Sequence, residues 1–366
     1  MKCFVIGPAE LGKQERERWR RLQSSNPSLA SPCFSWQFTL AAAGVRRDAR
    51  IAVLEDDGDI VGFFPHHWRL GAGEPIAGRM SDHHGVIAAP GTRWDWHELL
   101  KAARLSYWPF DHLPGSQRPP GMTGHAESPG LDLSEGFDAW LERKRALGAS
   151  VAKLPARLRR TAPELGPLRL TLDSRDRGDF ETVLRLKSQQ CLRTGQLDFF
   201  ALGWPRELAE RIRDIDDPDF GGRLSTLHAG DVLLAAHFGM RTPQVWHWWF
   251  PVYNSEYHQH SPGSLLLLEV ARTAAAQGHE LLDLGRGDEE YKRRFSDCSW
   301  PLLEGMVSRP TAITAARRWR KSLGRWLRTS PVAAPALPLL KRLKRLAAAA
   351  VFVPVPDWVP TAPVWM

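Results

Sequence analysis

Residues 261–292 read SPGSLLLLEVARTAAAQGHELLDLGRGDEEYK, and the fold of the chain is best inferred outward from this stretch. A turn leads into the apolar run 262–276, which predicts a helix that ends near Gly278. Residues 280–284 then predict a short buried strand, followed by an arginine between two glycines. A turn, a helix, a strand and a polar cluster in this order are typical of an α/β protein that holds a phosphate-bearing cofactor beside a reactive group.

The start of the predicted helix is a candidate anion site. Ser261 stands where an N-cap oxygen is wanted, and Pro262 suits the first helical position because its missing N–H would be unpaired there anyway. Gly263 and Ser264 are small enough for a ligand to approach the amides of the first turn, which can bind a phosphate together with the helix dipole. The alternative is a capped core helix without a ligand, because LLLLEVA is almost entirely apolar.

The strand that follows carries one carboxylate, Asp283, among leucines. A buried carboxylate needs a partner, and Arg286 at the strand end is the natural one. We expect this pair either to bind a ligand or only to fix the turn, and the two roles are compatible. Tyr291 and Lys292 continue onto a short helix, where Tyr291 is expected to face the core and Lys292 either to contact phosphate or to be solvated.

One histidine, His237, lies in the apolar strand pattern VLLAAHFGM. It is interpreted either as a satisfied core residue or, if it faces a cleft, as a general base, because a near-neutral pKa suits proton transfer. The next strand and loop, residues 245–263, gather Trp, His and Tyr side chains, Tyr253 among them, ahead of the predicted phosphate turn. Because alternate residues of a strand face opposite sides of the sheet, only half of these can line a cleft.

Length and cysteine usage narrow the class of protein. The 366 residues are enough for two domains with full cores. The four cysteines form no CxxC pair, which argues against a disulfide framework or a zinc knuckle and suits a reducing cytoplasm. Two pairs of adjacent histidines, at 66–67 and 83–84, would point to opposite sides of a strand, so no metal site is expected. No run approaches the ~20 apolar residues of a membrane span, and we expect a cytoplasmic protein.

The net charge of +8 is unevenly distributed. Residues 1–304 hold 38 Lys and Arg against 40 Asp and Glu, so no nucleic-acid partner is expected, whereas residues 305–366 hold 11 basic residues and one acidic residue. Residues 312–328 and 339–351 predict two amphipathic helices with basic faces. Either they dock on the body of the protein or residues 312–351 make a peripheral contact with the anionic inner face of a membrane.

Both halves of the chain predict strands joined by tight turns. Asp57-Gly58 is the turn of a hairpin within residues 51–64, and three antiparallel strands are predicted within residues 223–250. The Pro- and Gly-rich residues 112–130 are the best candidate boundary. The pattern favours a duplicated α+β module with mixed α/β order. The predicted divisions are an N-terminal half (1–130), a helical linker (131–167), a C-terminal half (168–310), which the resemblance described below implies to be catalytic, and a basic tail (311–366).

These residues together resemble the CelD-like acyltransferase domain of the GNAT superfamily, a group related to the Fem-type aminoacyltransferases. The resemblance is carried by HFG in the 237–239 strand, by NSEY at 254–257, by SPGSLLL at 261–267 and by QGHELLDLGRGDEEYKRRF at 277–295. It implies tandem GNAT-like modules, each a mostly antiparallel mixed sheet flanked by helices, with a basic helical tail. It also implies acetyl-CoA or another acyl-CoA as the acyl donor.

The resemblance further implies the roles of individual residues. The turn that grips the donor's phosphates falls on His260–Leu265, so His260, Ser261, Gly263, Ser264 and Leu265 are implied to bind the cofactor, with Lys292 as a further contact.

The reaction that the resemblance implies moves an acyl group to an amine or a hydroxyl. The acceptor would be a small molecule or a glycan precursor, such as a sugar or a cell-envelope or exopolysaccharide precursor. In this hypothesis His237 is the base, Asp283 and Arg286 orient the acceptor or fix the site, and Tyr291 or Tyr253 supplies the proton to the leaving thiolate.

Two alternatives remain open at this point. One is a Fem-type transferase that uses aminoacyl-tRNA, since SPGS stands where a glycine-rich loop is usual. The balanced charge of residues 1–304 speaks against it. The other is a non-catalytic GNAT-fold binding module that associates with a membrane.

Overall fold

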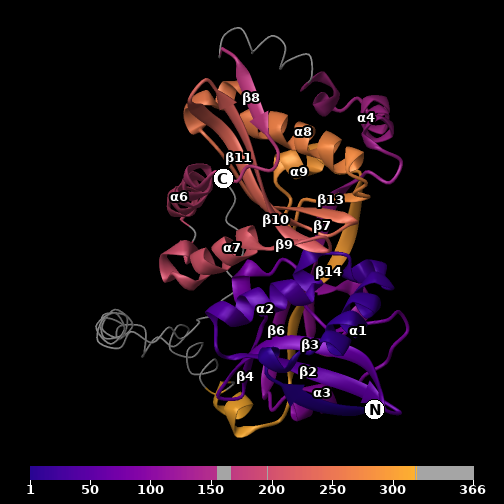
Figure 1. Ribbon diagram of the computed structural model, residues 1–366. Helices are drawn as coiled ribbons and strands as arrows, with labels where there is room; N and C mark the ends of the chain where they lie inside the picture. Colours follow the sequence, from indigo (N-terminus) through magenta and orange to yellow (C-terminus); the bar gives the residue numbers. More distant parts are fainter. Residues whose placement is uncertain (155–165, 196, 318, 320–366) are drawn as a thin grey trace, which may run out of the picture. The chain divides into compact units, whose positions relative to one another are not determined.

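The computed structural model describes residues 1–154, 166–195, 197–317 and 319. One compact unit comprises residues 1–309, and a second unit begins at Pro310 (Figure 1). In the second unit residues 312–317 are helical, and the predicted helix over 339–351 lies outside the described residues. No helix in the described part of the chain is long and apolar enough to cross a membrane.

One large mixed sheet runs through the first unit. Its main order is β1-β2-β3-β4-β6-β14-β7-β13-β12-β11-β10-β8, with β5 beside β3 and β9 beside β10. Most neighbours are antiparallel, and the parallel pairs are β4 with β6 and β12 with β13. The strands are β1 Lys2–Ile6, β2 Ala49–Asp56, β3 Asp59–Arg69, β4 Ala72–Pro75, β5 Ile87–Ala88, β6 Tyr107–Pro114, β7 Met122–Asp132, β8 Leu168–Thr171, β9 Asp216–Asp217, β10 Phe220–Ala229, β11 Val232–Arg241, β12 Val245–Tyr253, β13 Leu281–Asp283 and β14 Cys298–Ser308.

The predicted hairpins are confirmed. Asp57 and Gly58 join β2 to β3 with positive φ angles of 49° and 90°, as a type I′ turn requires. The three strands predicted within residues 223–250 correspond to β10, β11 and β12. The mixed α+β fold expected from the sequence is therefore present.

Strands from the two ends of the unit meet in the middle of the sheet. β14 pairs with both β6 and β7, and β7 pairs in turn with β13, where Asp132 lies opposite Leu281. Residues 112–130, the predicted boundary, contain the end of β6 and most of β7. The sheet thus passes from one half of the chain to the other without a break, and the predicted domain limits stay predictions.

Helices cover both faces of this sheet (Figure 1). In the second half, α8 packs on β10 to β13 and against α4, whereas α6 and α7 pack on the opposite face and α2 joins α7. The helix predicted over 262–276 is confirmed as α8 with those bounds. The helices are α1 Lys13–Ser24, α2 Trp36–Val45, α3 Trp96–Ala102, α4 Phe137–Ala146, α6 Arg177–Arg193, α7 Trp204–Asp214, α8 Pro262–Ala276 and α9 Glu290–Phe295.

Two apolar layers fix β11, β12 and β13 between these helices. Trp246, Leu266 and Leu282 are buried on the α8 side, and Phe180 and Phe238 are buried on the α6 side. Burial of each such side chain contributes roughly 1.5–3 kcal/mol. The strands that carry the polar residues of the candidate site are therefore held from both faces.

Candidate active site

The candidate site is built on the parallel pair β12 and β13. The two strands pair in register from Val245 opposite Leu281 to His247 opposite Asp283. β13 ends at Asp283, whereas β12 continues to Tyr253 beside β11. The strands therefore part beyond His247, and open α/β sheets bind ligands at the carboxyl ends of their parallel strands.

A cavity of about 310 Å³ opens where the strands part. The sequence-predicted residues that line it are Tyr253, Ser261, Gly263, Ser264 and Tyr291. They are joined there by Gln190, Ala236, Trp248, Pro251, Val252, His258, Pro262, Leu266 and Leu267. A concave, largely apolar lining with a few polar groups suits a small-molecule ligand.

Two residues of the predicted phosphate turn do not line this cavity. Leu265 is buried in the core against the sheet, with 3% of its surface exposed. His260 closes the short 3₁₀ segment Ser255–His260 that precedes α8. The direct ligand contacts implied for these two residues are therefore not supported by their positions.

The first turn of α8 offers fewer free amides than the sequence predicted. Ser261 is the N-cap, but it adopts a left-handed conformation (φ 53°, ψ 48°) and its side chain makes no cap hydrogen bond. Its carbonyl oxygen accepts hydrogen bonds from the amides of Ser264 (3.0 Å) and Leu265 (3.1 Å). Pro262 has no N–H, so within the described chain the Gly263 amide is the one left to donate to an anion at this positive helix end.

Arg294, on α9, brings a positive charge to the same turn. Its guanidinium donates a hydrogen bond to Oγ of Ser264, and its buried Nε has no partner among the described residues. A guanidinium with a donor to spare beside a helix start is suited to a phosphate group. Arg294 is not among the residues predicted from the sequence, although it lies three residues after Tyr291 on the same predicted helix, and this spacing places the two on one face.

The predicted phosphate contact of Lys292 is wrong. Its ammonium group donates to the carbonyl oxygens of Gly285 (3.2 Å) and Arg286 (2.7 Å) and pairs with Glu289 at 3.1 Å. These contacts use all three donors of the side chain, which is 5% exposed. Lys292 therefore holds the glycine-flanked loop in shape.

Four donors satisfy the buried carboxylate of Asp283. Its Oδ2 accepts hydrogen bonds from Nε2 of His83 and Nδ1 of His247, each at 3.0 Å. Its Oδ1 accepts hydrogen bonds from Oγ of Ser128 and the amide of Gly285, each at 2.9 Å. Asp283 thus holds together four groups at the end of β13, although none of them belongs to Arg286, the predicted partner.

The predicted Asp283–Arg286 pair does not form. Arg286 donates to the carbonyl oxygen of Asp111 (2.9 Å) and to the carboxylate of Glu304, so it ties the loop to β6 and β14. The left-handed turn at Gly285 (φ 70°) takes the chain out of the strand before Arg286. The carboxylate left behind is satisfied by two imidazoles from distant parts of the sequence.

His247 joins carboxylates from the two halves of the chain. Its Nε2 lies 2.9 Å from Oδ2 of Asp82, its Nδ1 contacts Asp283, and the side chain is fully buried. Burial by itself would lower the pKa of His247, but the carboxylates of Asp283 and Asp82 raise it to about 10. The pKa of Asp82 is lowered by the His247 imidazolium despite burial, which opposes this shift. The result is a buried carboxylate–imidazolium–carboxylate chain that is charged at neutral pH.

Tyr291 connects the cavity to this charged chain. Burial raises the pKa of the Tyr291 hydroxyl far above its ordinary value, and the nearby carboxylates of Glu289 and Asp82 add to the effect. Tyr291 therefore keeps its proton at neutral pH and is a donor within the cavity lining. Tyr253 lines the same cavity but is 47% exposed.

The position of His237 disfavours the predicted role of general base. Its ring is fully buried and stacks on Trp248, with 3.8 Å between ring centroids and 12° between planes. Burial, and then the charge of His247, lower the pKa of His237 well below its ordinary value. Neither ring nitrogen has a hydrogen-bond partner among the described residues, and the ring is not part of the cavity lining.

One group among the described residues has the composition of a metal site: His84, Asp111 and His112. However, Nε2 of His84 already accepts hydrogen bonds from the amides of Asp111 (3.2 Å) and His112 (3.3 Å). The lone pair that a metal would need is therefore in use, and these residues do not fit a metal ion.

Part of this site lies in a stretch of the chain that is similar to a known family. Residues 152–293 match the model of the family described as acetyltransferase (GNAT) domain. The matched stretch contains every residue that lines the cavity. No curated protein sequence matches the chain.

Solved structures with a similar fold cover most of the chain. FemX has a TM-score of 0.55 and 11% sequence identity, over 84% of this chain and 96% of its own. A conserved protein of unknown function from Bacteroides thetaiotaomicron has a TM-score of 0.50 and 12% identity, over 81% of this chain and 97% of its own. A tandem GNAT protein from the clavulanic acid biosynthesis pathway has a TM-score of 0.47 and 12% identity, over 85% of this chain and 99% of its own. At these identities the first two similarities concern the fold alone.

Proposed function

We propose that this protein is an acyl-CoA-dependent acyltransferase that moves an acetyl or other acyl group to an amine or hydroxyl of a sugar or cell-envelope precursor. The observation that carries the proposal is the cavity at the parting of β12 and β13, which lies within the residues that match a GNAT acetyltransferase domain. The start of a helix and a protonated tyrosine both line that cavity.

The residues at the start of α8 fit a phosphate-bearing donor. The backbone amide of Gly263 has no hydrogen-bond partner among the described residues. The buried Nε of Arg294 has none among them either. A pyrophosphate at this turn would accept hydrogen bonds from both groups. An acyl-CoA supplies the acyl group as a thioester, which is already activated for attack by a nucleophile.

Tyr291 is the residue best placed to give a proton to the departing thiolate. The high pKa of its hydroxyl keeps it protonated, and it belongs to the cavity lining. Asp82, His247 and Asp283 form the charged chain beside Tyr291. The carboxylate of Asp82, held in place by His247, can accept a hydrogen bond from an acceptor amine. In this scheme Asp283 is a positioning residue, since it acts through His247.

Transfer from aminoacyl-tRNA is the competing function within the same fold. Such a donor presents a polyanionic backbone, and proteins that bind it need a surplus of Lys and Arg along a groove. Residues 1–304 hold 38 basic against 40 acidic residues, so their composition does not supply that surplus. We therefore favour a free acyl-CoA as the donor.

Calorimetric titration of the full chain with acetyl-CoA, followed by assay of thiol release with a panel of amines, tests the proposal. Arg294→Gln should weaken acetyl-CoA binding about 10–100-fold by removing a charge-assisted contact to phosphate. Tyr291→Phe should leave binding intact and lower kcat by about 100-fold or more.

Matched controls exist for both variants. Arg293 is exposed on the same helix and faces Asp288, so Arg293→Gln should change neither quantity. Tyr257 is partly buried against the α8 core, so Tyr257→Phe controls for loss of a hydroxyl. If neither acetyl-CoA nor longer acyl-CoAs show saturable binding in the titration, acyl-CoA is not the donor. A tRNA-dependent transferase or a protein that only binds its ligand is then the better interpretation.

A further inference from the structure

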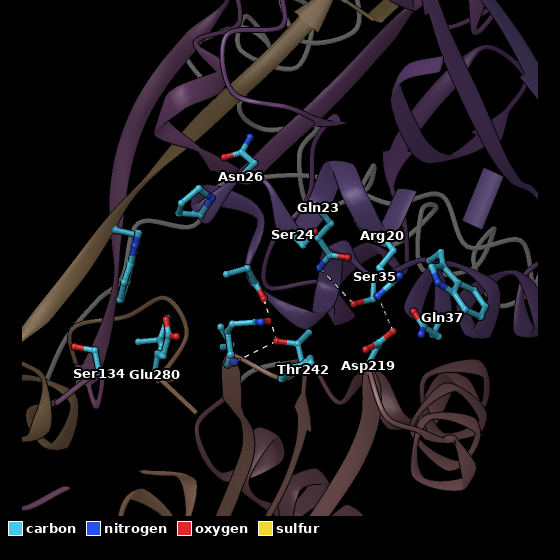
Figure 2. Close-up of a pocket in the computed structure, with 18 of the residues that line it drawn as sticks. Arg20, Gln23, Ser24, Asn26, Ser35, Gln37, Ser134, Asp219, Thr242 and Glu280 are labelled. Atoms are coloured by element: carbon cyan, nitrogen blue, oxygen red, sulfur yellow. Dashed lines mark hydrogen bonds and ion pairs between the residues drawn. The ribbon is translucent and has the colours of Figure 1, made fainter. Parts of the chain in front are cut away.

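A second pocket, of about 500 Å³, shares no lining residue with the 310 Å³ cavity of the candidate active site. It is formed by α1, the loop before α2 and the start of α2 on one side, and by the ends of β7, β12, β13 and β14 on the other. In Figure 2, Ser134 and Glu280 lie on one side of the open space, and Arg20, Ser35 and Asp219 lie on the other. Both halves of the chain therefore contribute to one binding surface.

Two tryptophans belong to the walls of this pocket. Trp36 and Trp300 are each partly exposed there, and neither indole N–H has a hydrogen-bond partner within the described chain. The guanidinium of Arg16 covers one face of Trp36 at 4.9 Å from the ring centroid. A Cβ at position 130 would come within 2.9 Å of the Trp300 indole, so Gly130 allows that ring to lie across β7. Indole rings of this kind offer a flat apolar face and a polar edge to a ligand.

One side-chain amide in the lining of this pocket has no hydrogen-bond partner among the described residues. Gln37, in the first turn of α2, is 6% exposed and makes no side-chain hydrogen bond to the described residues. Its neighbour Ser35 is also buried, but its Oγ accepts a hydrogen bond from Gln23 at 3.4 Å. An amide carries two donors and an acceptor, and those of Gln37 belong to the pocket lining, where a ligand can reach them. A ligand with several hydroxyl groups would satisfy them.

The charge of the pocket favours a cationic ligand. Its lining includes three carboxylates, Asp132, Asp219 and Glu280, against one guanidinium, that of Arg20. The guanidinium lies 2.9 Å from Glu17 and 3.9 Å from Asp219, so it offsets the charge of Asp219, and the other carboxylates of the lining are Asp132 and Glu280. An ammonium group is attracted both by such carboxylates and by the faces of indole rings.

A smaller cavity of about 180 Å³ continues from this pocket toward the charged chain of the active site. The residues that line both spaces are Pro27, Ala30, Val245, Leu281 and Trp300. The smaller cavity also reaches Asp283, which lies on the same face of the sheet as Val245 and Leu281, and the loop residue His83. A ligand in the large pocket can therefore extend one end toward Asp283 and its two histidines.

We infer that this pocket binds a sugar that carries a protonated amine, with its ring against Trp36 and Trp300 and its hydroxyls at Gln37. Its role as the acceptor rests on the proposed function. In that reaction the amine nitrogen bonds to the acyl carbon and the carbon–sulfur bond breaks. The bound ammonium group first releases one proton to solvent, because only the neutral amine can attack. The nitrogen loses a second proton as the amide forms and the thiolate takes up one, so the products are an amide, free CoA thiol and one released proton.

Direct titration of the full chain with glucosamine, without any acyl donor, tests the site. Glucosamine should bind at least about 10-fold more tightly than glucose or N-acetylglucosamine, and its affinity should fall as salt is raised because the carboxylates attract its ammonium group. Trp300→Ala and Trp36→Ala, which lie in opposite halves, should each weaken binding about 10-fold or more.

Trp68→Ala is the matched control, because this partly exposed tryptophan lies on β3 away from the pocket. Absence of saturable glucosamine binding up to about 10 mM in a folded protein overturns the inference, as does equal affinity for glucose. Saturable binding without acetylation in the presence of acetyl-CoA keeps the site and removes its role as acceptor. Acetylation of glucosamine that is lost in Trp300→Ala supports both.

Discussion

Replacing His247 by glutamine should remove a pH dependence that this imidazolium imposes on folding. The pKa of His247 is about 10 in the folded protein against an ordinary value of 6.5, because Asp283 and Asp82 overcome the effect of burial. Between these values the folded protein keeps a proton that the unfolded chain releases. The stabilisation from His247 is therefore complete below about pH 6.5 and is lost as the pH rises toward 10.

The size of the effect follows from linkage. One such proton changes the free energy of unfolding by about 1.4 kcal/mol per pH unit, so about 2 kcal/mol is lost between pH 7.0 and 8.5. In His247→Gln this contribution is absent. Urea unfolding followed by far-UV circular dichroism at the two pH values measures it directly, as the difference between the two free energies of unfolding.

The control is His237→Gln in the adjacent strand. His237 is equally buried, but burial lowers its pKa, so it is neutral throughout this range and its replacement should keep the wild-type pH dependence. Comparing the two variants removes contributions from all other titrating groups. The same pH dependence in wild type and His247→Gln would falsify the assignment of a buried imidazolium, and so would its loss in His237→Gln.

Three further substitutions probe the same strand end and loop. Asp283→Asn should cost about 3–5 kcal/mol in urea unfolding at pH 7, because it removes one charge of a buried ion pair, and combining it with His247→Gln should cost less than the sum of the two. Lys292→Met should lower the free energy of unfolding by about 2–3 kcal/mol, because two loop carbonyls lose their donor, and a thermal melt within 1 °C of wild type would contradict this. Gly287→Ala should reduce kcat more than acetyl-CoA affinity in the thiol-release assay and the titration. A Cβ there would clash with the Glu289 carboxylate and meet Lys292 Nζ at 2.9 Å, at a backbone φ of 139°, and so would displace the loop that precedes Tyr291.

The features that the sequence predicted well depend on neighbours along the chain. The bounds of α8 follow from a proline that suits a helix start and from a glycine just past the end, Gly278, with φ 83°. The β2–β3 hairpin follows from Asp57-Gly58, whose positive φ angles only a few residue types tolerate. Both signals are local, and tertiary packing agrees with them.

The features that the sequence did not predict depend on contacts between distant residues. The sequence predicts the nearby Arg286 as the partner of Asp283, but the imidazoles that contact this carboxylate lie 36 and 200 residues away. Their identity could not follow from spacing, because it depends on the order of strands across the sheet. The pairing of β14 with β6 and β7 is of the same kind, since no local pattern indicates which strand edge a late strand will meet.

The charged chain at the strand end also explains why the second half does not contain a complete site by itself. Asp82 and His83 come from the first half of the chain. Asp82 contacts His247, and His83 contacts the carboxylate of Asp283. A carboxylate as deeply buried as Asp283 is tolerated only with its positive partners in place. The residues that match an acetyltransferase domain, 152–293, include Asp283 and His247 but neither Asp82 nor His83. The first half therefore contributes a carboxylate and an imidazole to the buried charged group of the site, in addition to any ligand that it helps to bind.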